Sequence, residues 1–311
     1  MKIAVDLLGG DFAPKKVIAG IRLAIDRGFI KSEELVAIGD EEAFKSFAWR
    51  WLVRRHPIET ILGAKLDPQN LRNKASSIAI GVAQVKAGVF NAFMSAGNTA
   101  VVTMMAVALL GRIKERVKPA IGVPLPDSPN CLLLDIGAIV DCTVDDFFNL
   151  ALMGSTYANL FWGVRDPLVA LLNIGVESHK GPPVLVETHK QFTLGRHRPD
   201  GLPFTFGGNV EADKIFSPGL QANVVVCDGF VGNMVLKEYE VLKKRSNQAN
   251  WQDIGALPLL GVNGNVLIAH GKSKAKAIAN AIKAAKTAAI VNVNQQLAKL
   301  LAEPAPALSS V

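Results

Sequence analysis

The chain has 311 residues and half of them are hydrophobic, which is enough apolar material for one large α/β domain or two smaller ones. Its net charge of +7 suits nucleic acid, an anionic membrane or an acidic protein as a partner. However, no RRM, KH, zinc-finger or helix-turn-helix signature is present, and no basic run is interleaved with aromatic residues. We therefore expect no nucleic-acid partner.

The cysteines and the N-terminus bear on the compartment. Cys131, Cys142 and Cys227 form no CxxC pair, so they indicate neither a disulfide framework nor a metal site but a reducing environment. Asp6 interrupts the apolar N-terminus too early for a signal peptide, and no apolar run reaches transmembrane length. These features predict a cytoplasmic protein, with weak attachment to a membrane surface left open.

Short apolar strands alternate with longer amphipathic helices along the chain. The predicted strands are residues 3–5, 35–38, 58–62, 92–95, 131–135, 168–173, 223–227 and 266–270. The predicted helices are residues 14–27, 41–52, 76–87, 99–111, 144–161, 232–244 and 273–301. This alternation favours an α/β fold with an open, mostly parallel sheet, whose ligands bind at the carboxyl ends of the strands.

The chain contains no Ser/Gly linker and no internal repeat, so we interpret residues 1–302 as a single domain. Residues 303–311 contain two prolines and small residues and are predicted to be a flexible tail. The stretch 175–208 is rich in Gly, Pro and His and is predicted to be a mobile connection.

A first candidate anion-binding turn follows the first strand and contains Asp6, Gly9, Gly10 and Asp11. Two glycines let backbone N–H groups approach an anion, and the start of the next helix adds partial positive charge. A tight strand-to-helix turn without a ligand is an equally good interpretation of this pattern.

A second candidate turn contains Gly97, Asn98 and Thr99, where another strand ends and another helix begins. Small residues with helix-capping side chains suit a phosphate or carbonyl oxygen. An ordinary helix cap explains the same residues.

Further polar residues follow the later strands: Asn173, Lys180, Asp228, Asn233 and His270. Lys180 is suited to holding a phosphate or steadying an oxyanion, although a lone loop lysine is usually only solvated. Asp228 either orients Asn233 or caps a helix. The GKS that follows His270 is not a P-loop, because the first glycine of that motif is missing.

Taken together and in this order, the loops resemble the bacterial phosphate acyltransferase family of phospholipid synthesis (PlsX). The resemblance covers nearly the whole chain. The matching segments are KIAVDLLGGD (2–11), SSIAIG (76–81), SAGNT (95–99), LLLDIGAIVDC (132–142), ALMGSTYA (151–158), LLNIG (171–175), GNVE (208–211), VVVCDGFVGNMVLK (224–237) and GALPLLGVNGNVLIAHG (255–271).

This resemblance implies that a long-chain acyl group passes from acyl carrier protein to inorganic phosphate, which gives acyl phosphate and free carrier protein. It also implies a three-layer α/β/α fold with a mostly parallel sheet, like that of phosphotransacetylases and isocitrate-dehydrogenase-like enzymes. A homodimer is usual in the family, and no metal or redox cofactor is expected.

For this chemistry the protein must aim the phosphate and stabilise the oxyanion that forms on the thioester carbonyl. We expect Lys180, Asn233 and His270 to be catalytic. The residues expected to bind substrate or phosphate are Asp6, Gly9, Gly10, Asp11, Gly97, Asn98, Thr99, Asn173 and Asp228. All twelve are expected to meet in one anion pocket.

The sequence departs from the family pattern at three places that matter. The loop after Gly175 reads VESHKG, where relatives tend to be more acidic ahead of the lysine. Ile139 stands where relatives usually carry Asn. The helical hairpin of the family is shortened here to residues 237–254, where Lys243, Lys244 and Arg245 could provide only weak, salt-sensitive contact with a membrane.

Three other functions stay open. A phosphotransacylase acting on a short-chain coenzyme A thioester would share the fold and the chemistry. A non-catalytic relative that binds carrier protein would explain Ile139 and the short hairpin. A nicotinamide-dependent decarboxylating dehydrogenase of related fold is less well supported, because the sequence has no clustered Asp motif for a metal-bound hydroxy acid.

Overall fold

The computed structural model describes residues 1–65, 73–125, 127–128, 130–195, 204–217, 219–246 and 255–302. The chain divides into two compact units. Unit 1 is Met1–Arg112 with Asn250–Asn294, and unit 2 is Ile113–Ala249 with Gln295–Val311. The single domain over residues 1–302 stays a prediction, and the predicted flexible tail, residues 303–311, lies outside the described residues.

The strands of unit 1 lie in the order β3-β2-β1-β4-β11-β10. Neighbouring strands are parallel except β10, which runs antiparallel to β11. Four of them are buried along their whole length, which explains their nearly continuous apolar sequences. The bounds are Ile3–Asp6 (β1), Leu35–Gly39 (β2), Glu59–Leu62 (β3), Ala92–Ser95 (β4), Ala256–Leu260 (β10) and Val266–Ala269 (β11).

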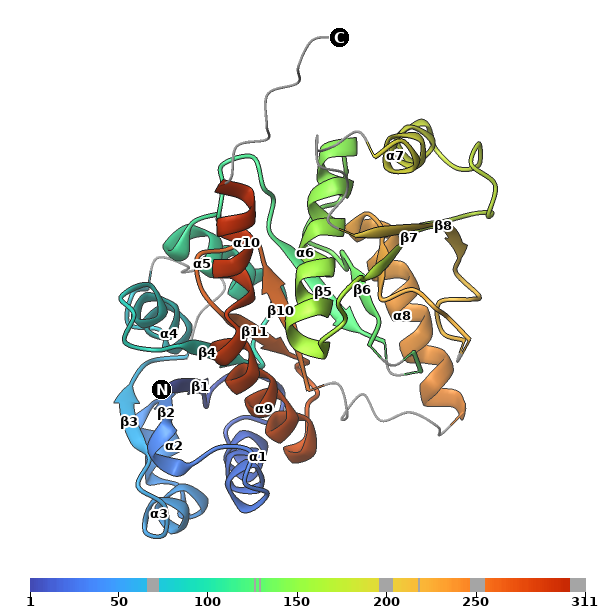
Figure 1. Ribbon diagram of the computed structural model, residues 1–311. Helices are drawn as coiled ribbons and strands as arrows, with labels where there is room; N and C mark the ends of the chain where they lie inside the picture. The colour runs from blue at the N-terminus through green and yellow to red at the C-terminus, as the bar shows by residue number, and fades with distance from the viewer. Residues whose placement is uncertain are drawn as a thin grey trace. The chain divides into compact units, whose positions relative to one another are not determined.

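The longer helices of unit 1 pack in two pairs, α1 with α9 and α4 with α5, and cover the strands (Figure 1). Close approach in the first pair depends on Gly20 of α1, which lies against Ile278 of α9. The bounds are Lys15–Asp26 (α1), Glu41–Lys45 (α2), Phe47–Val53 (α3), Ser77–Lys86 (α4), Thr99–Leu110 (α5) and Ala275–Val291 (α9), with a 3-10 turn at Ser32–Glu34.

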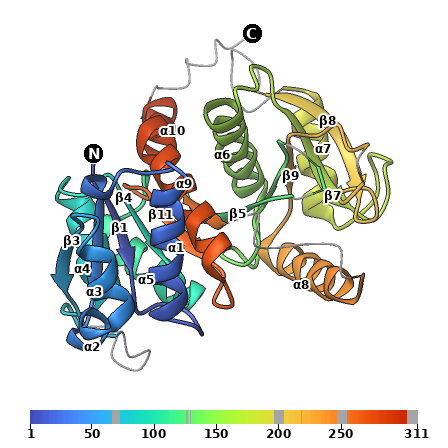
Figure 2. The ribbon, with the colours of Figure 1, turned by 90° about the horizontal axis from the view of Figure 1, so that it is seen from below.

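The strands of unit 2 lie in the order β5-β6-β9-β7-β8, and only β5 is antiparallel to its neighbour. Helices α6 and α7 pack against these strands, and α8 lies on the opposite side (Figure 2). The bounds are Ala120–Pro124 (β5), Leu132–Leu134 (β6), Val144–Trp162 (α6), Leu168–Asn173 (β7), Pro183–Thr193 (α7), Thr205–Glu211 (β8), Val224–Val226 (β9), Gly229–Ser246 (α8) and Val293–Ala302 (α10).

Each of the eight predicted strands is present, and so is the predicted mostly parallel sheet with helices on its faces. Two predicted helices are each broken in two. The break between α2 and α3 falls at Ser46, whose hydroxyl caps α3 by accepting the N–H of Trp49. The break between α9 and α10 falls at Asn292, which takes a left-handed conformation with φ of 47°.

The prediction of a mobile connection over residues 175–208 is wrong, because α7 and the start of β8 lie inside it. Three strands, β5, β8 and β10, were not predicted from the sequence. All three contain glycine or proline, which lower strand propensity, and pairing with a neighbouring strand outweighs that penalty. Within the described part of the chain, no helix has both the length and the apolar character needed to cross a membrane.

Because α1 packs closely against α9 at Gly20, we expect even substitution of Gly20 by alanine to lower the stability of the fold. A Cβ at this position would overlap the side chain of Ile278 close to the helix backbone, where it cannot swing away. Alanine favours a helix over glycine by about 1 kcal/mol, whereas overpacking costs about 1–3 kcal/mol. We therefore expect Gly20→Ala to lower the urea midpoint of unfolding.

The matched control is Gly219→Ala, because a Cβ at Gly219 would meet no atom within 4 Å. This change should alter the free energy of unfolding by no more than about 0.5 kcal/mol. A Gly20→Ala protein as stable as the original chain would show that α1 and α9 do not approach as closely as described.

Candidate active site

The turn after β1 is tied to the turn after β4 by a buried carboxylate. Asp6 is 1% exposed and accepts the N–H of Leu8 at 2.9 Å and the hydroxyl of Ser95 at 2.6 Å. The Ser95 oxygen in turn accepts the N–H of Gly97 at 3.0 Å. Burial raises the pKa of the Asp6 carboxyl, although the hydrogen bonds from Ser95 and Leu8 oppose this. Asp6 therefore joins the two turns through hydrogen bonds made in the protein interior.

Glycine allows three neighbouring turns of unit 1 to touch. A Cβ on Gly9 would lie only 2.6 Å from the backbone nitrogen of Gly97, and Gly10 has a φ of 96° that side chains rarely adopt. The N–H of Asp11 donates to the carbonyl of Gly271 at 2.8 Å, which joins the turn after β1 to the turn after β11. The turns after β1, β4 and β11 thus meet at one edge of the unit.

The remaining predicted residues of unit 1 lie in these turns and are exposed. Asn98 caps α5, since its side-chain oxygen accepts the N–H of Val101 at 3.2 Å, and Thr99 opens the helix. The first N–H groups of a helix have no acceptor within it, so the α5 terminus can bind an anion. His270 accepts the N–H of Lys272 through Nδ1 at 3.0 Å, which leaves the proton of a neutral ring on Nε2.

In unit 2, Asn173 closes the loop that carries Lys180. Its amide nitrogen donates to the Lys180 carbonyl at 3.0 Å, and its oxygen accepts the N–H of Ile174 at 2.8 Å. Gly181 has a φ of 90°, and a side chain there would overlap Asn173. Since Asn173 is only 8% exposed, it shapes the loop from inside.

The Lys180 side chain is half-buried, and its stem runs beside Gly175, where a Cβ would lie 3.2 Å from Lys180 Cγ. Among the residues that the structure describes, no carboxylate pairs with its ammonium group. This positive charge is available to a phosphate or to a developing oxyanion.

The helix α8 carries the other two predicted residues of unit 2. Asp228 caps the helix by accepting the N–H of Val231 at 2.9 Å, so the capping interpretation is confirmed. Asn233 lies one turn into α8 and is exposed, next to Gly137 of the loop that follows β6.

Sequence reasoning gave no role to Asp135, which follows β6. This buried carboxylate accepts three backbone N–H groups, from Ile121 at 2.8 Å, Ala138 at 2.7 Å and Ile139 at 2.6 Å. Burial raises its pKa against these hydrogen bonds. The signal was present, because an acid that ends a strand shortly before a glycine occurs both here and at Asp6.

A side chain on Gly229 would meet the Asp135 carboxylate at 2.5 Å, and one on Gly232 would overlap the Asp135 carbonyl. The start of α8 is therefore seated directly on this carboxylate. The N–H of Gly229 also donates to the carbonyl of Ile139 at 2.6 Å. Because the Ile139 side chain is only 5% exposed, this residue supports α8 through its main chain.

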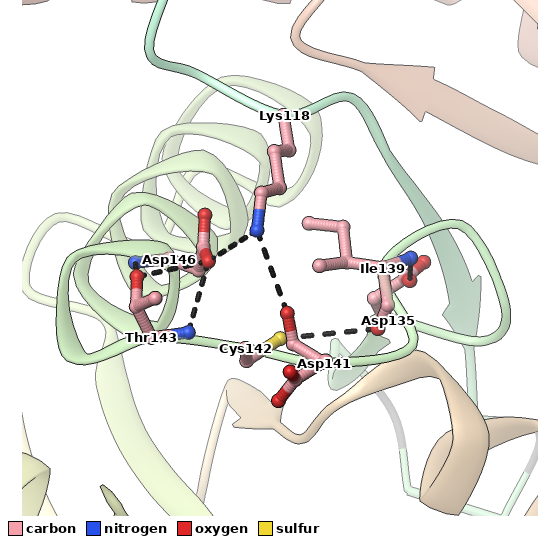
Figure 3. Close-up of polar contacts among 7 residues, drawn as sticks. All are labelled: Lys118, Asp135, Ile139, Asp141, Cys142, Thr143 and Asp146. Atoms are coloured by element: carbon pink, nitrogen blue, oxygen red, sulfur yellow. Dashed lines mark hydrogen bonds and ion pairs between the residues drawn. The ribbon is translucent and has the colours of Figure 1, made fainter.

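An ion pair fixes the far end of the same loop (Figure 3). The Lys118 ammonium lies 2.7 Å from the Asp146 carboxylate and 3.4 Å from the carbonyl of Asp141. Asp146 also accepts the N–H and the hydroxyl of Thr143, both at 2.9 Å, at the start of α6. Although burial acts to raise it, the hydrogen bonds from Lys118 and Thr143 hold the pKa of Asp146 below its ordinary value.

The twelve predicted residues thus form two sets, each at the carboxyl ends of neighbouring strands. Unit 1 contains Asp6, Gly9, Gly10, Asp11, Gly97, Asn98, Thr99 and His270, and unit 2 contains Asn173, Lys180, Asp228 and Asn233. That the two sets form a single pocket stays a prediction.

The sequence matches a known family along most of its length. A family model described as "Fatty acid synthesis protein" matches residues 1–244 and 239–296, and the two matches meet inside the predicted shortened hairpin. A phosphate acyltransferase from Desulforudis audaxviator is 36% identical, with 94% of this chain and 94% of that protein covered. A phosphate acyltransferase from Caldanaerobacter subterraneus is 34% identical, with 92% and 93% covered.

The fold is also found in a solved structure of much lower sequence identity. The EutD phosphotransacetylase from Staphylococcus aureus superposes with a TM-score of 0.65 at 15% identity, covering 93% of this chain and 94% of that one. The predicted phosphotransacetylase-like fold is confirmed. Since the relatives match over nine tenths of their length and the family model spans both sets of candidate residues, this chain belongs to the phosphate acyltransferase family.

Proposed function

We propose that this chain transfers a long-chain acyl group from acyl carrier protein to inorganic phosphate, in phospholipid synthesis. Its other proposed partner is a second copy of the chain, and the proposed compartment is the cytoplasm. The observation that carries the proposal is the meeting of three turns in unit 1, where Gly9 lies against Gly97 and Asp11 bonds to Gly271. Backbone N–H groups and a helix terminus at one place suit a multivalent anion such as phosphate.

In the proposed reaction an oxygen of phosphate attacks the thioester carbonyl carbon. The new C–O bond forms as the carbonyl oxygen becomes an oxyanion, and the C–S bond then breaks to give acyl phosphate. The proton lost from phosphate goes to the departing sulfur, so the carrier leaves as a free thiol. Phosphate is already a nucleophile, so the protein has to position it and stabilise the oxyanion.

We assign phosphate binding to the turns Gly9–Asp11 and Gly97–Thr99, with Lys180 supplying positive charge. The N–H groups of Asp11 and Gly97 donate within the turns themselves, so the proposed donors to phosphate are the N–H groups of Gly10, Asn98 and Thr99. Asn233 and Asn98 are the proposed hydrogen-bond donors to the carbonyl oxygen, because both are exposed amides in first helical turns or caps. His270 is proposed to bind phosphate or to protonate the sulfur from Nε2. The buried Asp6 and Asn173 serve this function by shaping the turns.

The activity predicts phosphate-dependent release of carrier thiol from palmitoyl-acyl carrier protein. Thiol release should rise with phosphate concentration and saturate, and acyl phosphate should accumulate in equal amount. Acetyl coenzyme A should be a much poorer substrate in the same assay. A preference for acetyl coenzyme A would identify a short-chain phosphotransacylase instead, and carrier binding without thiol release would identify a non-catalytic relative.

The positive charge of Lys180, which no carboxylate in the described ranges of the chain pairs with, predicts a large effect of its removal. Lys180→Ala should raise the KM for phosphate and lower kcat/KM by about 10²–10³-fold, because a positive charge aimed at the reacting anion is lost. The control is Lys190→Ala, which removes an exposed lysine from α7 of the same unit and should leave the kinetics unchanged. Normal turnover by Lys180→Ala at saturating phosphate would remove Lys180 from the mechanism.

A further inference from the structure

The large apolar side chains exposed in unit 2 include a group that surrounds the ends of three neighbouring strands. Val140 follows β6 and is 66% exposed, and Ile174 and Val176 follow β7 at 77% and 61%. Phe230 and Met234 lie in the first turns of α8, which follows β9, at 61% and 59%. We call these five residues the apolar rim.

The strand register shows that the residues of the apolar rim follow strands whose carboxyl ends lie at the same edge of the sheet. Leu134 at the end of β6 pairs with Val226 at the end of β9, and Val226 also pairs with Leu171 in β7. The hydrogen bond from Gly229 N–H to the Ile139 carbonyl places Phe230 and Val140, the residues that follow each of them, on adjacent backbone segments. Phe230 and Met234 are four residues apart and lie on the same face of α8.

The apolar rim adjoins the polar candidate residues of unit 2 along the chain. Asn233 precedes Met234 in α8, while Ile174 and Val176 belong to the loop that Asn173 closes around Lys180. An amide donor and an available ammonium group therefore lie in the same short segments as the exposed apolar side chains. This combination fits a ligand with a polarisable carbonyl at one end and a hydrocarbon chain at the other.

We propose that the apolar rim binds the hydrocarbon chain of the acyl thioester and sets the preference for chain length. The inference rests on the proposed function, since it assumes an acyl substrate. Apolar residues exposed singly need no explanation, but five around one edge present a surface that gains stability when a ligand covers it. A longer saturated chain covers more of this surface than a short one and binds more tightly.

The test compares acyl carrier proteins that carry palmitoyl and butyryl chains. The double variant Phe230→Ala with Met234→Ala should reduce the ratio of kcat/KM for palmitoyl to that for butyryl by about tenfold or more. The KM for phosphate should not change. Both side chains are exposed, so the variant should fold, and its circular dichroism and thermal midpoint should match those of the original chain.

The matched control removes two apolar side chains from the same helix, Val241→Ala with Leu242→Ala. These residues are 42% and 53% exposed, and Leu242 lies about 18 Å along α8 from Phe230. The control should keep the original ratio. An equal loss in both double variants, or an unchanged ratio in the Phe230 and Met234 variant, overturns the proposal.

A second readout does not depend on turnover. Isothermal calorimetry with S-hexadecyl and S-butyl pantetheine thioethers should show tighter binding of the hexadecyl compound to the original chain, and Phe230→Ala with Met234→Ala should remove that difference. A chain that shows this difference yet forms no acyl phosphate contradicts the proposed function and leaves the rim supported. If the variant instead changes the oligomeric mass in light scattering and keeps the chain-length difference, the rim is an interface between copies and the proposal is wrong.

Discussion

Buried carboxylates at strand ends are the constraint on which the candidate residues of both units depend. Asp6 and Asp135 each end a strand, are almost fully buried, and accept hydrogen bonds from the turn that follows or from the neighbouring element. Burial of an acid is unfavourable, as the raised pKa of both groups reflects. Removal of either carboxylate would leave buried N–H groups without acceptors, at about 1–3 kcal/mol each. The turns therefore have one low-energy arrangement.

Each of these carboxylates lies against a glycine, Gly9 in the turn after β1 and Gly229 at the start of α8. In unit 1 the Asp6 carboxylate lies 2.7 Å from where a Cβ on Gly9 would be, and in unit 2 that of Asp135 lies 2.5 Å from a Cβ on Gly229. The same arrangement thus occurs in both units: a buried carboxylate lies against a glycine, whose lack of a side chain allows the close approach. The result is a backbone held close to its neighbours before any ligand arrives, which is what stabilisation of a developing charge requires.

The sequence predicted those features that depend on local pattern. Strands β1, β2 and β4 are buried on both faces, so each is a continuous apolar run that is easily recognised in the sequence. Asn98 and Asp228 occupy positions where helix caps are expected, immediately before a helix. It failed where tertiary pairing outweighs propensity, as in β10 with Pro258 paired to Leu267. It also could not separate residues that shape a turn from residues exposed on it. Asn173 looks like a ligand-binding amide in the sequence, yet its side chain is used within its own loop.

The departure at Ile139 can be understood in the same physical terms. The position supports α8 with its carbonyl and accepts support from Asp135 through its N–H, while its side chain is buried. Main-chain bonds are available to any residue except proline, so the replacement of an amide by isoleucine leaves the seat of α8 intact. Asn233 lies on α8, which position 139 supports through its main-chain carbonyl whatever its side chain, and Lys180 lies in the separate loop that Asn173 closes. The specificity of this chain is therefore expected to lie in the exposed residues that follow the strands, because a shared fold does not by itself set function.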